Sequence, residues 1–192
     1  MNIPADFSFD QKCSKFFRYK DFFECSDTYK KNDCLNLPQQ EPTLFAIRSL
    51  AVDVLDKVCE KFGELHLTYG FCSMDLSKLV PRNIDPRIDQ HAGHEIKRNG
   101  KPICDRLGFA SDFFVPSVSS LVVARYIVSE LPFDRLYYYG DDSPIHVSLS
   151  SDPIRQIVLM PAHKNRRIPK VITEQKFLKD AIPFSGISNS NI

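Results

Sequence analysis

The stretch Leu107-Gly108-Phe109-Ala110-Ser111-Asp112-Phe113-Phe114-Val115 is an apolar run that a single carboxylate interrupts. Its apolar and aromatic residues predict a core strand over residues 107–115. A carboxylate in a buried strand is costly unless it is paired, hydrogen-bonded or bound to a metal. The stretch therefore predicts a strand of the central sheet and a functional position at Asp112.

The segments around this strand predict the fold class. Residues 43–62 carry apolar side chains at three- and four-residue spacing, which predicts a helix, and Gly63 follows where a left-handed cap would end it. A second helix is predicted over residues 117–131, and further strands are predicted at 65–69, 135–139, 145–149 and 154–160. Strands mixed with a few helices indicate an α+β fold, with a central antiparallel or mixed sheet flanked by helices.

The remaining segments set the expected domain boundaries. Residues 1–42 are rich in Phe and Tyr without a clear period, and we expect an N-terminal extension of short helices and turns that packs its aromatic side chains onto a domain at 43–172. Residues 80–103 are loop-like and contain the turn pair Asn99-Gly100. Residues 173–192 are expected to form a partly flexible C-terminal tail that frays from Thr173 onward.

The length and net charge of the chain limit the kinds of partner that we expect for it. The 192 residues suit one domain, and the formal charge of +1 gives no general attraction to nucleic acid or anionic membranes. The basic run from Lys164 to Lys170 is interpreted as a solvated loop, so nucleic acid is not an expected partner. No stretch reaches the roughly 18 consecutive apolar residues of a membrane span. The first twelve residues do not resemble a secretory signal, which predicts a cytoplasmic protein.

The cysteines are expected to be free thiols. They show no C-x-x-C pair, which argues against a structural cysteine zinc site. Nothing in the sequence suggests the oxidising compartment that a disulfide framework needs. The six residues are Cys13, Cys25, Cys34, Cys59, Cys72 and Cys104.

Two histidines join Asp112 as candidate metal ligands. His146 interrupts the predicted strand 145–149, and His91 lies in the polar stretch Asp89-Gln90-His91. Two imidazoles and one carboxylate leave one tetrahedral position open for water, as in catalytic zinc sites. The competing interpretation is that Asp112 pairs with an arginine or with backbone amides and that both histidines are ordinary core or loop residues.

The order of these motifs resembles the M15 peptidases, the zinc D-Ala-D-Ala carboxypeptidase and dipeptidase family, which shares its fold with the hedgehog signalling domain. The resemblance covers about half of the chain. It is carried by the long helix ending Phe62-Gly63, Leu67-Thr68-Tyr69-Gly70-Phe71-Cys72-Ser73, Asp89-Gln90-His91, Gly108-Phe109-Ala110-Ser111-Asp112, the second helix, Phe133-Asp134-Arg135-Leu136 and Ile145-His146-Val147-Ser148. It implies a hedgehog/DD-peptidase-like fold and zinc held by His91, Asp112 and His146.

The chain departs from the family in the spacing of its ligands. In the family the first His precedes the Asp by seven positions, and here the residue seven positions before Asp112 is Asp105 instead of a His. An insertion from Gly93 to Arg106, turned by Asn99-Gly100, would instead keep His91 and Asp112 together. His94 as the imidazole ligand and Asp105 as the carboxylate ligand remain the alternatives.

The chain also departs from the family in its catalytic residues. Cys72 stands where the family has an arginine that steadies the substrate and transition state, and a Cys72 thiolate could serve as a fourth metal ligand. No Glu lies just before His146, so only Asp141 or Asp142 could replace the family's catalytic base. The resemblance places Cys72, Ser73 and Tyr139 among the residues that would contact substrate.

Two functions follow from these observations. The first is a zinc-binding, metal-dependent hydrolase that acts on a small peptide or a related amide. The second is a catalytically inactive, peptidase-like module that binds or assembles with a protein partner, which the loss of the Arg and Glu favours.

Overall fold

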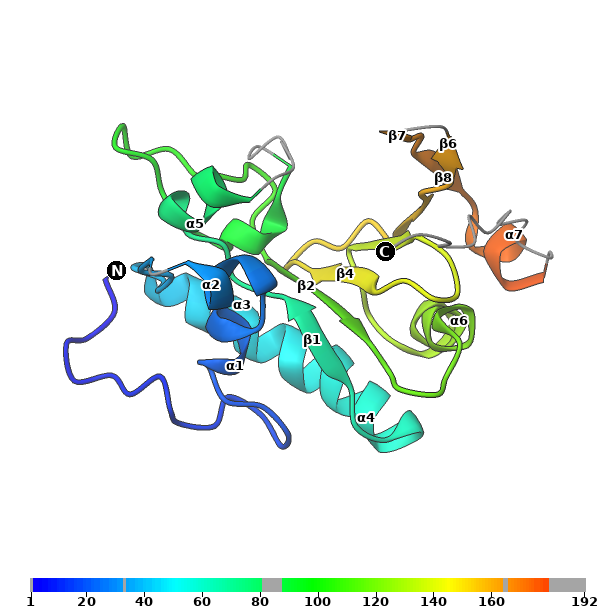
Figure 1. Cartoon of the computed structure of the whole chain (residues 1–192), viewed down its shortest axis with the longest axis horizontal. Coiled ribbons are helices and arrows are strands. Elements are labelled where there is room, and N and C mark those ends of the chain that lie inside the picture. Colours follow the sequence, from blue (N-terminus) through cyan, green and yellow to red (C-terminus); the bar gives the residue numbers. More distant parts are fainter. Residues whose placement is uncertain (1, 33, 81–87, 164–165, 180–192) are drawn as a thin grey trace.

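The protein is seen here in a computed structural model, which describes residues 2–32, 34–80, 88–163 and 166–179. It contains helices, short 3-10 or π segments and strands in a mixed order along the chain (Figure 1). The elements are α1 (Asp21–Glu24), α2 (Asp27–Lys31), α3 (Glu41–Leu50), η1 (Ala51–Leu55), α4 (Asp56–Phe62), β1 (His66–Tyr69), α5 (Met74–Leu79), η2 (Gln90–Ala92), β2 (Phe109–Phe114), α6 (Ser120–Glu130), β3 (Arg135–Tyr138), β4 (Ile145–Leu149), β5 (Gln156–Leu159), β6 (Ala162–His163), β7 (Arg166–Arg167), β8 (Lys170–Ile172) and α7 (Glu174–Lys179).

The centre of the molecule is a six-stranded mixed sheet. Its strand order is β1-β2-β4-β3-β5-β8, and β6 and β7 form a separate two-stranded hairpin. All neighbouring pairs of the large sheet are antiparallel except β3 and β5, which are parallel. The predicted α+β class with a mixed sheet is confirmed, and each of the five predicted strands is present.

One long helical stretch covers one face of this sheet. α3, η1 and α4 follow one another without a break from Glu41 to Phe62, and η1 is a π-helical turn in the middle of the stretch (Figure 1). Gly63 ends the stretch at a φ of +94°, a conformation that favours glycine. The helix predicted from the apolar period of residues 43–62 is therefore confirmed.

The hydrophobic core lies between this helical layer and the sheet. Inward-facing side chains of neighbouring strands are buried there, among them Phe113, Val147, Leu136 and Ile157. Val147, Leu136 and Ile157 are register partners in one row across the sheet. Phe113 lies two residues along β2 from Ser111, the partner of Val147, so all four residues share one face. Residues of the opposite face are consequently free to form a site.

The N-terminal extension packs its aromatic side chains onto this core, as expected. Phe17, Tyr19, Phe22 and Phe23 are buried, and Phe22 contacts Phe109 of β2 edge-to-face at 5.8 Å between ring centroids. The extension forms short helices and turns. Its aromatic residues therefore belong to the same core as the sheet.

The C-terminal part of the described chain differs from expectation. Instead of fraying from Thr173, residues Glu174–Lys179 form α7, which lies beside α6. Phe177 is fully buried there and contacts Tyr138 at 5.8 Å between ring centroids. The ion pair between Arg155 and Glu174 and the packing of Leu178 also hold this helix against the domain. Residues 180–192 of the predicted tail lie outside the described residues.

The segment before β2 folds back as predicted. The amide of Lys97 donates to the carbonyl of Lys101 at 2.8 Å, and Gly100 has a φ of +78°. The Asn99-Gly100 pair therefore turns a hairpin-like excursion between η2 and β2. All six cysteines are free, as expected.

Candidate metal centre

The site begins with one row of residues that runs across the sheet. Asp112 on β2 is the register partner of His146 on β4 and also of Tyr69 on β1. His146 is in turn the partner of Tyr137 on β3, which is the partner of Val158 on β5. Residues that face each other across neighbouring strands project to the same side of the sheet. This row therefore forms the floor of a site on the face opposite the long helix.

His91 reaches the row from the loop that crosses this face. Its Nδ1 lies 2.8 Å from the carbonyl oxygen of Gly70, directly after β1. Its backbone carbonyl accepts from the amide of Cys72 at 3.0 Å, and its amide donates to the Asp89 carboxylate at 3.1 Å. Because Nδ1 faces the Gly70 carbonyl, Nε2 is the ring nitrogen that faces Asp112.

The three candidate ligands converge on a small volume. Nε2 of His91 lies 3.4 Å from Oδ1 of Asp112, and Nδ1 of His146 lies 2.7 Å from the same oxygen. One ligand atom from each residue falls within 4.8 Å of the other two. His91 is 2% exposed and His146 9%, whereas the Asp112 side chain is 28% exposed. The cluster is thus shielded at its back and open at the carboxylate.

Aromatic rings hold both histidines in place. Tyr137 stacks on His146 with ring centroids 4.7 Å apart and an angle of 20° between the ring planes. Tyr69 meets His91 edge-on at 4.6 Å. These tyrosines restrict the rotation of the imidazoles. The alternation of Tyr137 with Tyr139 along a predicted strand is the sequence signal that places Tyr137 on this face.

A buried polar network fixes the residue before His91. The side-chain amide of Gln90 donates to Asp134 at 2.9 Å and to the carbonyl of Leu107 at 2.8 Å, and its oxygen accepts from the hydroxyl of Ser148 at 2.8 Å. Asp134 is fully buried and forms a two-point ion pair with Arg106. This network connects the His91 loop to the start of β3 and to β4, and no local pattern in the sequence predicts it.

The electrostatics of the cluster favour a cation. Burial by itself lowers the pKa of His91, but the Asp112 carboxylate outweighs burial and raises that pKa to about 9. Burial likewise would raise the pKa of Asp112, but His91 and His146 hold it well below its usual range. Positive charge facing Asp112 is therefore stabilised at neutral pH.

The cluster lies at the base of a cavity of about 770 Å³. Apolar side chains such as Val158, Met160 and Val171 form one wall, and Tyr69, Tyr137 and Tyr139 also line it. Besides Asp112, the acidic residues Asp27 and Asp89 contribute to the lining. The volume would suit a small, partly apolar ligand next to the ligand cluster.

The alternative ligands lie apart from the cluster. Nε2 of His94 accepts a hydrogen bond from the amide of Gly108 at 3.2 Å, and its own amide donates to Thr43. Asp105 is exposed and lines neither the cavity nor the cluster. The structure brings together His91, Asp112 and His146, because the hairpin at 93–106 loops out between the first ligand and β2.

The two carboxylates predicted as catalytic bases do not reach the site. Asp141 accepts hydrogen bonds from the Ser119 hydroxyl at 2.7 Å, the Leu121 amide at 3.2 Å and the Tyr138 hydroxyl at 2.8 Å. It therefore caps the N-terminus of α6. Asp142 is exposed beside it, and neither residue lines the cavity. The turn at 140–144 directs the Asp141 carboxylate toward the start of α6, so the structure brings neither predicted base to the ligand cluster.

The predicted substrate contacts are only partly placed at the cavity. Tyr139 lines it, as expected. Ser73 instead caps α5, where its hydroxyl accepts from the Leu76 amide at 3.1 Å. Cys72 is buried outside the ligand cluster, and burial raises the pKa of its thiol to about 12, which disfavours the thiolate that a fourth ligand would require.

Comparison with known proteins finds no matching protein family, no similar curated protein and no similar solved structure. Among the described helices, none is long and apolar enough to cross a membrane.

Proposed function

We propose that His91, Asp112 and His146 bind a divalent metal ion, zinc in preference, and that the protein is a metal-dependent hydrolase of a peptide or related amide bond. The observation that carries the proposal is the convergence of two imidazoles and one carboxylate, with ligand atoms within 4.8 Å of one another, at the base of the cavity. The order of motifs that resembles the M15 peptidases supports the same choice of metal and reaction.

The donor set fits tetrahedral zinc. Ligand atoms about 2.0–2.1 Å from a tetrahedral ion lie about 3.3 Å from one another. The distance of 3.4 Å between His91 and Asp112 already matches this spacing, whereas the 2.7 Å contact between His146 and Asp112 would need to open by about 0.6 Å. The hydrogen bond from His91 Nδ1 to the Gly70 carbonyl is the outer contact that commonly orients a zinc-binding histidine.

The residues around the cluster have separate roles in the proposed reaction. Bound zinc would supply Lewis acidity, which polarises a carbonyl and lowers the pKa of a coordinated water to about 7. Asp89 is the cavity carboxylate two residues before His91 and could accept a proton in place of the absent family Glu. The tyrosines and the apolar wall would position a small peptide or amide substrate and limit the access of water.

A specific observation favours a second candidate, a peptidase-like module that binds a protein partner without catalysis. Asp141 and Ser73 are both used as helix caps, and Cys72 replaces the family's arginine. The part of the cavity lining that the structure describes holds neither Arg nor Glu. A metal in such a protein would have a structural role.

The metal content of the purified protein tests the first step of the proposal. We expect about one equivalent of zinc by mass spectrometry after reloading and dialysis, since three ligands and an open position complete one site. His91→Ala, Asp112→Ala and His146→Ala should each abolish it. His94→Ala and His66→Ala are matched controls, because both remove an imidazole outside the cluster, and they should retain zinc. Absence of zinc from the reloaded parent protein would refute the metal site.

Hydrolysis assays separate the two candidates. The zinc-loaded protein should cleave at least one member of a panel of dipeptides, D-Ala-D-Ala and simple amides, and Asp89→Asn should slow cleavage while leaving the zinc content unchanged. Stoichiometric zinc without cleavage of any member would reject hydrolysis of these substrates and support the binding module.

A further inference from the structure

A second feature of the fold is the outer edge of β1, on the side away from β2 and the metal centre. β1 is the first strand of the sheet order, and within the described strands it pairs only with β2. The outer side of an edge strand presents unpaired N–H and C=O groups that another chain can pair with. The sequence His66-Leu67-Thr68-Tyr69 contains neither Pro nor Lys, two residues that commonly protect such an edge.

The chain's own N-terminal extension is hydrogen-bonded to the backbone just past the C-terminal end of this edge. The amide of Phe71 donates to the carbonyl of Phe22 at 2.7 Å, just beyond Tyr69. Gly70 permits this approach, because a Cβ at this position would lie 2.3 Å from the Phe22 carbonyl oxygen. The register shift of β1 against β2 also lies toward this end, between Leu67 and Tyr69.

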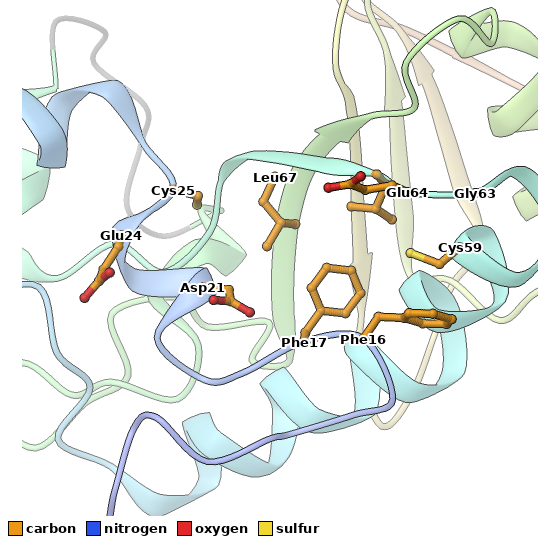
Figure 2. Close-up of a pocket in the computed structure, with 10 residues that line it drawn as sticks. Phe16, Phe17, Asp21, Glu24, Cys25, Cys59, Gly63, Glu64 and Leu67 are labelled. Atoms are coloured by element: carbon orange, nitrogen blue, oxygen red, sulfur yellow. The ribbon is translucent and has the colours of Figure 1, made fainter.

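The N-terminal end of β1, near Leu65 and Leu67, borders an open groove of about 640 Å³. Leu65 and Leu67 line it from the strand side, Phe16 and Phe17 from the N-terminal extension, and Cys59 from α4. Figure 2 shows Leu67 and Phe17 pointing toward one another across this groove. Phe16 is 47% exposed. The groove therefore combines a strand edge with apolar side-chain contacts.

The charged residues of the groove are all acidic. Asp21, Glu24 and Glu64 line it, and the described lining contains no Lys or Arg (Figure 2). The side chain of Glu64 is 88% exposed. A segment with positive charge would be attracted to this surface, and one with negative charge would be repelled.

We propose that this β1 groove binds an extended segment of a partner protein in which Lys or Arg alternates with apolar residues. The backbone of the segment would pair with the outer edge of β1, its apolar side chains would contact Leu67 and the exposed ring of Phe16, and its basic side chains would lie against the three carboxylates. Because β1 has four residues, the interface is small and the complex is transient, with a Kd on the order of micromolar.

The negative charge of the β1 groove argues against two other segments that could bind there. A second copy that paired through β1 would bring its own Asp21, Glu24 and Glu64 against the same residues. Residues 180–192 of this chain contain Asp180 and no Lys or Arg. A basic segment of another protein is the occupant that the carboxylates favour.

Peptide binding to the full chain tests the proposal. The probes are fluorescein-labelled ten-residue peptides that alternate Lys or Arg with Val, Ile or Phe, and a matched set with Glu at the charged positions. Anisotropy should show saturable binding of basic peptides only, and amide shifts in NMR spectra should map to β1. Methylation of alternate peptide-backbone nitrogens should abolish binding, because it removes the strand hydrogen bonds.

A matched pair of variants identifies the site. Glu24→Lys/Glu64→Lys should weaken binding at least ~10-fold, whereas Asp53→Lys/Glu130→Lys, with the same change in net charge at exposed positions outside the groove, should change it less than ~3-fold. Equal weakening by both variants, binding that tolerates backbone methylation, or no binding of any basic peptide would each overturn the proposal. Dimerisation through β1 in sedimentation experiments, with no peptide binding, would overturn it in favour of a self-interface. None of these outcomes depends on the metal centre.

Discussion

Asp112 and His146 face each other on the antiparallel strands β2 and β4, and Nδ1 of His146 lies 2.7 Å from Oδ1 of Asp112. The sheet itself therefore sets two of the three candidate ligands side by side. His91 is added by a loop and is fixed through Gly70, Cys72 and the Gln90 network. A site of this kind has a rigid floor and one ligand whose position depends on the packing of a loop.

Zinc should stabilise the folded protein through this cluster. A ligand present at about 100 times its Kd adds about 2.7 kcal/mol to the free energy of unfolding when it binds only the native state. We expect this increase in urea unfolding of the parent protein and of His94→Ala. His146→Ala should show no zinc-dependent increase. Equal stabilisation of His146→Ala would place the ion elsewhere.

Gly70→Ala should damage both stability and metal binding. The added Cβ would lie 2.3 Å from the Phe22 carbonyl oxygen, so strand and α1 must move apart, and Gly70 also provides the carbonyl that faces His91 Nδ1. We expect a loss of about 1–3 kcal/mol of stability and zinc affinity lower by roughly 10–100-fold.

Gly63→Ala is the control for Gly70→Ala. A Cβ added at position 63 would have open space around it. The expected loss of stability comes only from the φ of +94°, which an alanine adopts with strain. It should lose stability while its zinc affinity stays unchanged. Unchanged zinc affinity in folded Gly70→Ala would show that the Gly70 carbonyl does not orient His91.

The ion pair between Asp134 and Arg106 should make stability depend on pH in the acid range. Burial by itself raises the pKa of Asp134, but Arg106 and the amide of Ile154 outweigh it and hold this pKa below its usual range. Because the folded-state pKa is lower than the unfolded one, the stabilisation is complete above the unfolded pKa and is lost as the pH falls through the folded one.

Asp134→Asn measures this contribution. The difference in unfolding free energy between the parent and the variant, in the presence of a chelator, should be largest at neutral pH and should shrink toward pH 3, about one unit below the ordinary Asp pKa. Asp152→Asn is the control, since Asp152 is exposed, and its difference should stay small across the range. A difference for Asp134→Asn that does not vary with pH would contradict the assigned ion pair.

Phe177→Ala should destabilise the whole domain, because α7 belongs to the folded structure. Phe177 is fully buried beside Tyr138, and removal of a buried Phe side chain costs about 3–5 kcal/mol. The exposed neighbour Gln175→Ala should change stability by less than about 0.5 kcal/mol. A negligible effect of Phe177→Ala on urea unfolding would restore the interpretation of a frayed tail at these residues.

The sequence predicted the elements whose pattern is strong and local. The apolar period of residues 43–62 identified the long helix, and the apolar runs around Asp112 and His146 identified two central strands. The short helix α5 was missed because its six residues hold too little periodic signal. α7 was missed because its six residues include only one that is fully buried, Phe177, and its other contacts come from distant residues such as Arg155.

By itself, the sequence determined that Asp112 is a costly residue in an apolar strand and that His146 and His91 are its plausible partners, since hydrophobic patterning and the cost of burying charge are local properties. Only the tertiary structure decided that His94 and Asp105 lie apart, that Asp141 caps α6, and that Gln90 and Asp134 support the loop. These outcomes depend on strand register and on the path of loops, which long-range packing sets. A shift of one residue in the pairing of β2 with β4 would have kept every local pattern and separated Asp112 from His146.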